Sequence, residues 1–294
     1  MKKMKKIDIT AVILAKNEEK NLPRCLKNLE WVKEIIVIDD YSSDNTKKIA
    51  EKFGAKVYQK KLVNFESQRN WALQKVKTPW VLMIDPDEEV TSEFRQEVEK
   101  VIKENKFAGF KFPRKNIIFG KWIKHTGWYP DWQLHLFRTK RGKYVGKVHE
   151  QVVLDGKIGT LNAPLIHYNY HSISQYLQKL DRYTNLRAEE KVKEGYKFRY
   201  QDLLIKLAEE FFRRFFAEEG WRDGVHGLAL SLLQSFSELV VYLKVWEKQN
   251  FKVFDIKDFD KVGEKIVSDY YYWQVTISKN PLKKIYYRIK RKVL

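Results

Sequence analysis

The chain has 294 residues, of which 44% are hydrophobic, a formal net charge of +19, and one cysteine, Cys25. That length allows one domain of about 170 to 200 residues beside a smaller helical part, and a single cysteine excludes an internal disulfide. No run reaches the roughly 18 consecutive apolar residues of a membrane span, and the basic start has no signal-peptide core. We therefore expect a cytoplasmic protein that has neither a spanning helix nor a signal peptide.

Two apolar runs rich in β-branched residues, 7–14 and 34–38, predict the first strands. The first run breaks at Asn17, and the second ends at Asp39 and Asp40. Polar residues therefore follow both strands directly.

Helical spacing follows these strands. Residues 45–53 and 67–76 predict helices, and residues 55–58 predict a short strand between them. Strands that alternate with helices imply βαβ units, so the expected fold is α/β, a mostly parallel sheet flanked by helices.

The apolar run 81–84 predicts a buried strand that ends at Asp85-Pro86-Asp87. Ligands of an α/β sheet bind at the carboxyl edge of its strands, and paired carboxylates there suit a hard divalent cation, Mg²⁺ or Mn²⁺. The alternative is that these acids only precede the helix signalled at residues 91–93. We expect the polar residues of three strand ends to converge at one edge, namely Asn17, Asp39, Asp40, Asp85 and Asp87.

Four ordered motifs over about residues 8–110 resemble the family 2 glycosyltransferases, which have a GT-A fold that binds nucleotide-diphospho-sugars. They are Ala15-Lys16-Asn17-Glu18, Val37-Ile38-Asp39-Asp40-Tyr41-Ser42-Ser43-Asp44-Asn45-Thr46, Ser67-Gln68-Arg69-Asn70 and Asp85-Pro86-Asp87-Glu88. The family more often has glycine where Tyr41 stands, so the local turn is expected to differ.

The resemblance implies roles for these residues. Asp39 and Asp40 would bind the base and ribose, and Asp87, with Asp85 close by, would hold a metal ion that stabilises the diphosphate leaving group. The other residues implied at the nucleotide-sugar are Ala15, Asn17, Glu18, Arg69, Asn70 and Pro86. Two alternatives stay open: an acidic helix-capping turn at 39–44, and an exposed helix face at Arg69 and Asn70.

Later segments resemble the subgroup that glycosylates the lipopolysaccharide core, namely residues 128–133, 136–138 and 148–150. Direct transfer to a hydroxyl needs a base. Glu150 stands where family 2 enzymes carry their catalytic acid and is the first candidate. Asp131, in an aromatic cluster with Trp128, Tyr129 and Trp132, is the second. His149 would touch metal or phosphate, or be structural.

The composition shifts after about residue 172 towards long helical patterns, at 174–196, 201–218 and 227–248. We therefore place the nucleotide-sugar-binding and catalytic domain at 1–172 and a helical, basic region for acceptor or membrane contact, or for oligomerisation, at 173–294.

Two segments of that region suggest partners. The apolar stretch 228–242 predicts either a membrane-facing helix or a helix of the core or of an oligomer interface. The tail 279–294 combines seven cations with aliphatic and aromatic residues and contains no acid. It suits anionic lipid headgroups or, alternatively, is a solvated or disordered basic end.

Together these features predict an inverting, metal-dependent glycosyltransferase. It would move a sugar from a nucleotide-diphospho-sugar, with a UDP-sugar preferred, to a glycolipid acceptor of the lipopolysaccharide core or a related envelope glycan. We expect it at the inner face of the cytoplasmic membrane as a peripheral protein, with a homo-oligomer open and no nucleic-acid partner.

Three alternatives remain at this level. A polyprenyl-phosphate glycosyltransferase would need no strong base, because its acceptor is already ionised. A nucleic-acid binder would explain the charge, but the chain lacks zinc-finger, RNP and KH patterns. A nucleotidyltransferase would normally show a glycine-rich phosphate loop, which this sequence lacks.

Overall fold

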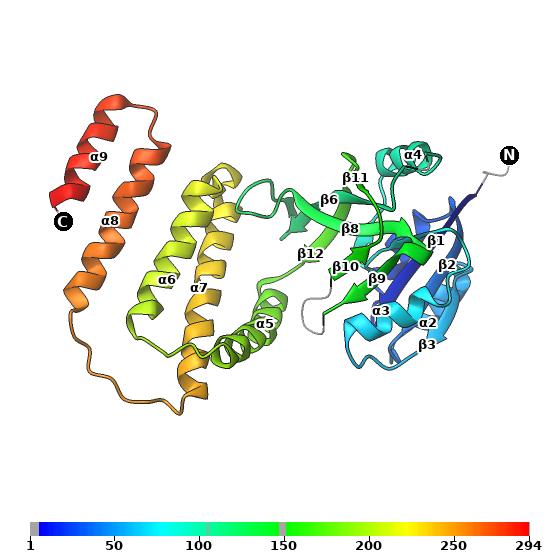
Figure 1. Cartoon of the computed structure of the whole chain (residues 1–294), viewed down its shortest axis with the longest axis horizontal. Coiled ribbons are helices and arrows are strands. Elements are labelled where there is room, and N and C mark those ends of the chain that lie inside the picture. Colours follow the sequence, from blue (N-terminus) through cyan, green and yellow to red (C-terminus); the bar gives the residue numbers. More distant parts are fainter. Residues whose placement is uncertain (1–5, 105, 147–150, 294) are drawn as a thin grey trace. The chain divides into compact units, whose positions relative to one another are not determined.

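The computed structural model describes residues 6–104, 106–146 and 151–293. The chain divides into two compact units (Figure 1). Unit 1 comprises the described residues up to Ile117 together with Pro130–Asn169, and unit 2 comprises Ile118–Tyr129 and the described residues from Tyr170 onward. The segment between residues 118 and 129 therefore leaves the sheet-containing unit and returns to it. The domain boundary expected at residue 172 stays a prediction.

Unit 1 contains most of a ten-stranded sheet with the main strand order β3-β2-β1-β4-β8-β6-β12-β5. Strands β7 and β11 both pair with β6, and β9 and β10 form a separate hairpin. The strands are β1 (Ile7–Ala15), β2 (Val32–Asp39), β3 (Lys56–Gln59), β4 (Trp80–Met83), β5 (Glu88–Glu89), β6 (Gly109–Ile118), β7 (Lys121–Trp122), β8 (Asp131–Arg138), β9 (Gly142–Val145), β10 (Gln151–Leu154), β11 (Ile158–Thr160) and β12 (Leu165–Tyr170).

The first strands pair in parallel. Ala15 of β1 lies opposite Asp39 of β2, and Val12 of β1 lies opposite Met83 of β4. These strands are buried on both faces, which explains why each reads as a continuous apolar run. As predicted, β1, β2 and β4 end at the same edge of the sheet.

The second half of the sheet is largely antiparallel. Strand β8 pairs antiparallel with both β4 and β6, and β12 pairs antiparallel with β5. The fold class, α/β with a C-terminal helical region, is confirmed, but the sheet is mixed, with parallel order mainly in β3-β2-β1-β4. The physical reason is that β6 and β8 are joined by residues 119–130 without a crossover helix, which parallel neighbours require.

Helices cover both faces of this sheet. They are α1 (Leu22–Lys27), α2 (Thr46–Lys52), α3 (Phe65–Leu73) and α4 (Ser92–Val101), and a 3-10 turn spans Thr139–Arg141. Asn64 caps α3 by accepting from the Ser67 N–H at 2.8 Å, and Thr91 caps α4 by accepting from the Phe94 N–H at 3.1 Å. The two apolar clusters that result, one on each face, fix the sheet and the ends of its strands.

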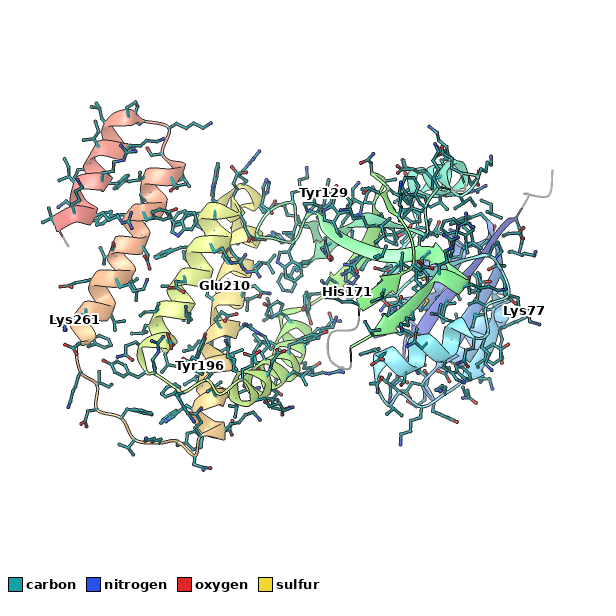
Figure 2. All side chains as sticks on the ribbon, viewed as in Figure 1. Lys77, Tyr129, His171, Tyr196, Glu210 and Lys261 are labelled. Carbon is teal, nitrogen blue, oxygen red and sulfur yellow. The ribbon has the colours of Figure 1, made fainter. Side chains whose placement is uncertain are left out.

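Unit 2 is helical, as the sequence patterns predicted. Its elements are α5 (Ile173–Lys193), α6 (Gln201–Phe212), a π-helical turn (Arg213–Ala217), a 3-10 turn (Gly220–Asp223), α7 (Val225–Lys248), α8 (Phe259–Ile277) and α9 (Pro281–Val293). Arg187 of α5 donates to both carboxylate oxygens of Glu238 on α7, at 2.6 and 3.0 Å. Tyr196, labelled in Figure 2, packs edge-on against Tyr242 of α7 with ring centroids 5.6 Å apart.

Helix α7 has one buried side and one exposed side. Leu230, Val241 and Val245 are buried, whereas Leu232 and Phe236 are about half exposed. Within the described residues, α7 is the one helix whose length and mean hydropathy would allow it to cross a membrane, and 33% of its most apolar window is buried in the protein. A core helix meets the same criteria, and both alternatives for residues 228–242 stay predictions.

The start of α7 provides a test of packing in unit 2. A Cβ added at Gly227 would lie 1.8 Å from the backbone oxygen of Gly220, whereas one added at Gly263 in α8 would have no atom within 4 Å. We therefore expect Gly227→Ala to lower the free energy of unfolding by about 1 to 3 kcal/mol through overpacking. Gly263→Ala is the matched control, and it should raise that free energy by up to about 1 kcal/mol through helix propensity. Urea unfolding measures both, and equal effects of the two substitutions would contradict this packing.

Candidate functional site

A turn at the end of β4 carries the acidic motif. The Glu88 N–H donates to the Asp85 carbonyl at 2.9 Å, and the Asp85 N–H donates to the Glu88 carboxylate at 2.8 Å. Pro86 is buried inside this turn. The chain therefore holds three carboxylates, those of Asp85, Asp87 and Glu88, at the end of one strand.

Two arginines balance this charge. Arg69 of α3 approaches Asp85 with nitrogen and oxygen 3.4 Å apart. Arg114 of β6 lies 3.1 Å from Glu88, 3.9 Å from Asp85 and 2.7 Å from Asp131. Both arginine side chains are largely buried, so the exposed-helix alternative for Arg69 is wrong. The turn after β4 is therefore held by ion pairs from two other elements, α3 and β6.

Burial and charge separate the pKa values in this cluster. Burial raises the pKa of Asp85, but Arg69, His135 and Arg114 outweigh burial and lower it to about 2. Burial, reinforced by the charge of Asp85, raises the pKa of Glu88 to about 7. Burial and Arg69 also lower the pKa of His135 to about 3. Among the described residues, the buried Nδ1 of His135 is one of the side-chain atoms without a hydrogen-bond partner.

Asp87 faces a histidine that the sequence did not single out. His167 Nε2 of β12 lies 3.5 Å from the Asp87 carboxylate. Asp131 only accepts hydrogen bonds, so it orients the Asn116 amide by accepting from its Nδ2 at 3.2 Å. The Asn116 oxygen then points to His167 Nδ1 at 2.7 Å, which makes Nδ1 the donor. Nε2 is then the ring nitrogen that faces Asp87.

These two side chains fit a divalent cation. A carboxylate that faces an imidazole nitrogen across 3.5 Å, with the imidazole oriented from behind by an amide, is typical of a metal ligand pair. No group of three or more histidine, cysteine, aspartate and glutamate side chains able to hold a metal occurs within residues 6–104, 106–146 and 151–293. Phosphate oxygens and water would have to complete the coordination, as Mg²⁺ and Mn²⁺ sites commonly allow.

The other candidate base, Asp131, is already heavily hydrogen-bonded. One carboxylate oxygen accepts from Arg114 Nε at 2.8 Å and from Asn116, and the other accepts from Gln133 at 2.7 Å. The aromatic cluster that we expected around Asp131 does not hold its carboxylate. Its hydrogen-bond partners are instead polar residues of β6 and β8. Trp128 instead packs edge-on against Tyr170.

The ends of β1 and β2 are joined through Asn17. Its backbone N–H donates to Ser42 Oγ at 2.9 Å, and its side-chain oxygen accepts from the Ser43 N–H at 2.8 Å. Asn17 and Tyr41 both have positive φ, +57° and +50°. Glycine adopts this left-handed conformation without steric cost, which accounts for its frequency at the position of Tyr41 in the family that the sequence resembles.

Asp39 and Asp40 are buried and have partners in the protein. Asp39 accepts from the Ser42 N–H and from Gln59, both at 3.1 Å. Asp40 accepts from Lys16 at 2.8 Å and from the Leu62 N–H at 2.9 Å, and these bonds, led by that from Lys16, lower its pKa. The two carboxylates thus fix the loops that follow β1, β2 and β3, in addition to lying at the carboxyl edge of the sheet.

Ala15, Glu18 and Asn70 were also predicted at the nucleotide-sugar, and each makes hydrogen bonds within unit 1. The carbonyl of Ala15 accepts from the Asp40 N–H at 2.9 Å, and the Glu18 N–H donates to Thr46 at 2.7 Å. Asn70 exchanges two hydrogen bonds with the backbone of Tyr144 on β9, at 2.8 and 2.9 Å, so it anchors the hairpin. Glu150 and His149 lie outside the described residues.

Comparisons with known proteins place the chain in a family. The model of glycosyl transferase family 2 matches residues 10–157. A glycosyltransferase of Rickettsia conorii is 29% identical over 261 residues, covering 81% of this chain and 90% of that protein. LpsC of Rhizobium meliloti, a lipopolysaccharide core biosynthesis glycosyltransferase, is 23% identical over 256 residues, covering 84% and 95%.

Among solved structures, the TarS 1-349 fragment of S. aureus is 15% identical, with a TM-score of 0.43, and the match covers 86% of this chain and 95% of that chain. A complex of the same fragment with UDP gives a TM-score of 0.43 at 16% identity, with the same coverage.

The raised pKa of Glu88 predicts a pH effect on stability. Since the folded pKa, about 7, exceeds the ordinary value of 4.5, the unfolded chain releases this proton first as the pH rises. The contribution of protonated Glu88 is therefore complete below pH 4.5 and lost by about pH 7. Glu88→Gln has no such proton to lose. As the pH rises from 4.5 to about 7, its free energy of unfolding should therefore rise relative to that of wild type by up to about 3 kcal/mol. Urea unfolding at several pH values measures this gain, and parallel pH profiles would contradict the shift.

Proposed function

Because the chain belongs to glycosyl transferase family 2, we propose that it is an inverting, metal-dependent enzyme that moves a sugar from a nucleotide-diphospho-sugar to a cell-envelope glycan. The observation that carries the proposal is the turn after β4, where Asp87 faces His167 across 3.5 Å beside the charge-balanced carboxylate Asp85. This is the carboxyl edge where α/β sheets bind ligands.

The donor diphosphate would lie over this turn. A divalent cation bound there would neutralise the negative charge that grows on the leaving diphosphate. Asp87 and His167 would hold the cation, and Arg69 and Arg114 would keep Asp85 ionised beside it. The arginines also place fixed positive charge near the phosphates, so the protein needs little rearrangement as the bond to the anomeric carbon breaks.

The nucleoside would occupy the ends of β1 and β2. Asp39 and Asp40 are suited to accept from base and ribose donors, and Ala15, Asn17 and Glu18 shape that loop. We place a UDP-sugar first among the donors. Binding there would compete with the contacts that Asp40 makes to Lys16 and Leu62, so a rearrangement of this loop accompanies occupancy.

The base remains Glu150 in this proposal, with Asp131 second. A base needs a lone pair directed at the acceptor hydroxyl. Arg114, Asn116 and Gln133 already occupy most of the accepting positions of Asp131. Asp131 then acts mainly by holding Arg114 against Glu88 and Asp85.

For the acceptor, we propose the lipopolysaccharide core or a related envelope glycolipid. The support is the similarity over 84% of this chain to LpsC, whose name assigns it to lipopolysaccharide core biosynthesis. A glycolipid acceptor requires access to a membrane surface, so we also propose peripheral association with the inner face of the cytoplasmic membrane.

The proposal is tested with a panel of nucleotide sugars. With Mn²⁺ present, at least one UDP-sugar should raise the Tm of the wild-type protein, because a ligand that binds only the folded state stabilises it. Asp87→Ala should abolish this Mn²⁺-dependent rise and lower transfer by at least about a hundredfold. Asp8→Ala, which changes a mostly exposed carboxylate on β1, is the matched control. Undiminished Mn²⁺ dependence in Asp87→Ala would show that the metal site is misplaced.

The base is tested by single-turnover transfer. Glu150→Gln keeps the size of the side chain but does not accept a proton at neutral pH, so transfer should fall by about a hundredfold to ten-thousandfold with donor affinity almost unchanged. Asp131→Asn should reduce transfer less. The reverse ranking would assign the base to Asp131, and nearly full transfer by both variants would favour an ionised phosphate acceptor.

A further inference from the structure

Helix α9 packs on α8 through one side only. The ring of Tyr287 lies 6.0 Å from that of Tyr271. On the same side, Arg291 Nε donates to Ser268 Oγ at 3.4 Å, and its guanidinium lies 5.0 Å from the ring centroid of Tyr272. Tyr287 and Arg291 thus mark the side of α9 that faces α8.

The opposite side of α9 is an exposed apolar stripe. At about 100° per residue, its members fall within an arc of about 100° on the side away from Tyr287 and Arg291. They are Leu282, Ile285, Tyr286, Ile289 and Val293, and each is between 52% and 80% exposed. Most of this stripe therefore stays exposed within the described chain, and Ile285 and Ile289 also border a groove beside α8.

Cations border this stripe on both sides. At the same angular spacing, Lys283 and Lys290 flank one border, and Arg288 and Lys292 flank the other. Helix α9 contains no acid. Long cationic side chains beside an apolar stripe can bury their methylenes while the charge reaches polar headgroups, which is the pattern of a helix that lies in a membrane interface.

A groove between α8 and α9 adds a second observation. It has a volume of about 340 Å³. Val275, Ile285 and Ile289 contribute apolar surface, and Arg288, Arg291 and Lys292 line it with positive charge. No acidic residue lines the groove as the structure describes it. Such a groove suits a phosphate that is attached to an apolar chain.

We propose that α9 is a membrane-docking helix that lies in the interface of a bilayer containing anionic phospholipids. The stripe enters the boundary between headgroups and acyl chains, and the cations of the groove bind lipid phosphates. This surface deepens the proposed function by naming how the enzyme reaches a membrane-bound acceptor, and only that link rests on the proposed function.

Charge and shape favour lipid over the other occupants. A second copy of the same surface would bring two sets of cations together, which is repulsive. Nucleic acid would satisfy the cations but would leave the aliphatic side chains of Leu282, Ile285 and Ile289 without an apolar partner. An anionic bilayer satisfies both the charge and the stripe.

The test is cosedimentation of the full chain with vesicles. Wild type should bind vesicles of equal parts phosphatidylglycerol and phosphatidylcholine well above vesicles of phosphatidylcholine alone. Ile285→Gln/Ile289→Gln should lower the partition coefficient at least about tenfold, because it removes apolar surface. The matched control is Val253→Gln/Ile256→Gln, which changes two aliphatic residues that are 88% and 67% exposed in the segment between α7 and α8, and it should bind as wild type does.

A second double substitution tests the contribution of the cations separately from that of the apolar stripe. Arg288→Gln/Lys292→Gln should lower binding to the anionic vesicles by about 25-fold, since each cation near such a surface contributes about fivefold. The control Lys100→Gln/Lys103→Gln, on and just after α4, should have little effect. Circular dichroism and Tm must be unchanged in every variant, and a lower Tm calls for the milder Ile285→Ser/Ile289→Ser in its place.

Three outcomes would overturn the proposal. Equal wild-type binding to both vesicle types would exclude anionic lipid as the partner. Unchanged binding by the stripe variant would reduce α9 to a solvated basic end, and tight binding to polyuridylate with none to vesicles would make the partner nucleic acid. Stabilisation by UDP and Mn²⁺ should persist in the stripe variant, because the variant does not alter the donor site. If UDP and Mn²⁺ fail to stabilise even the wild type, the proposed function is contradicted, and the result on membrane docking is unaffected.

Discussion

The site depends on one electrostatic constraint, the crowding of Asp85, Asp87 and Glu88 into a single turn at a largely buried sheet edge. Like charges this close are stable only when cations or protons balance them. Arg69 and Arg114 provide most of that balance, and burial leaves Glu88 with a raised pKa. The arginines come from α3 and β6, so the same charges that suit a metal and a diphosphate also fix two distant elements against the end of β4.

Much of the parallel part of the fold could be predicted from sequence. Strands buried on both faces are continuous apolar runs, and this signal located β1, β2 and β4 together with the acids that follow them. The shared edge of Asp39 and Asp85 then followed from the parallel order that βαβ units impose on their strands. Local pattern sufficed here because each functional residue stands next to its own strand in the chain.

The rest of the site could not be predicted in this way. Arg114 lies inside β6 and His167 inside β12, and they reach the site through the antiparallel pairs β4-β8, β8-β6 and β12-β5, of which β4-β8 and β12-β5 join strands that are distant in sequence. No local spacing encodes that order. The sequence showed a tail that mixes cations with aliphatic and aromatic residues, but only the packing of Tyr287 on Tyr271 shows which side of α9 leaves its apolar residues largely exposed.

The metal-binding pair is the central claim, and crystallography tests it most directly. Crystals soaked with UDP and Mn²⁺ would be measured at the manganese absorption edge. We predict an anomalous peak between the Asp87 carboxylate and His167 Nε2, with the diphosphate of UDP as a further ligand. Manganese elsewhere, or UDP bound at the edge of β1 and β2 with neither residue near the metal, would contradict the assignment.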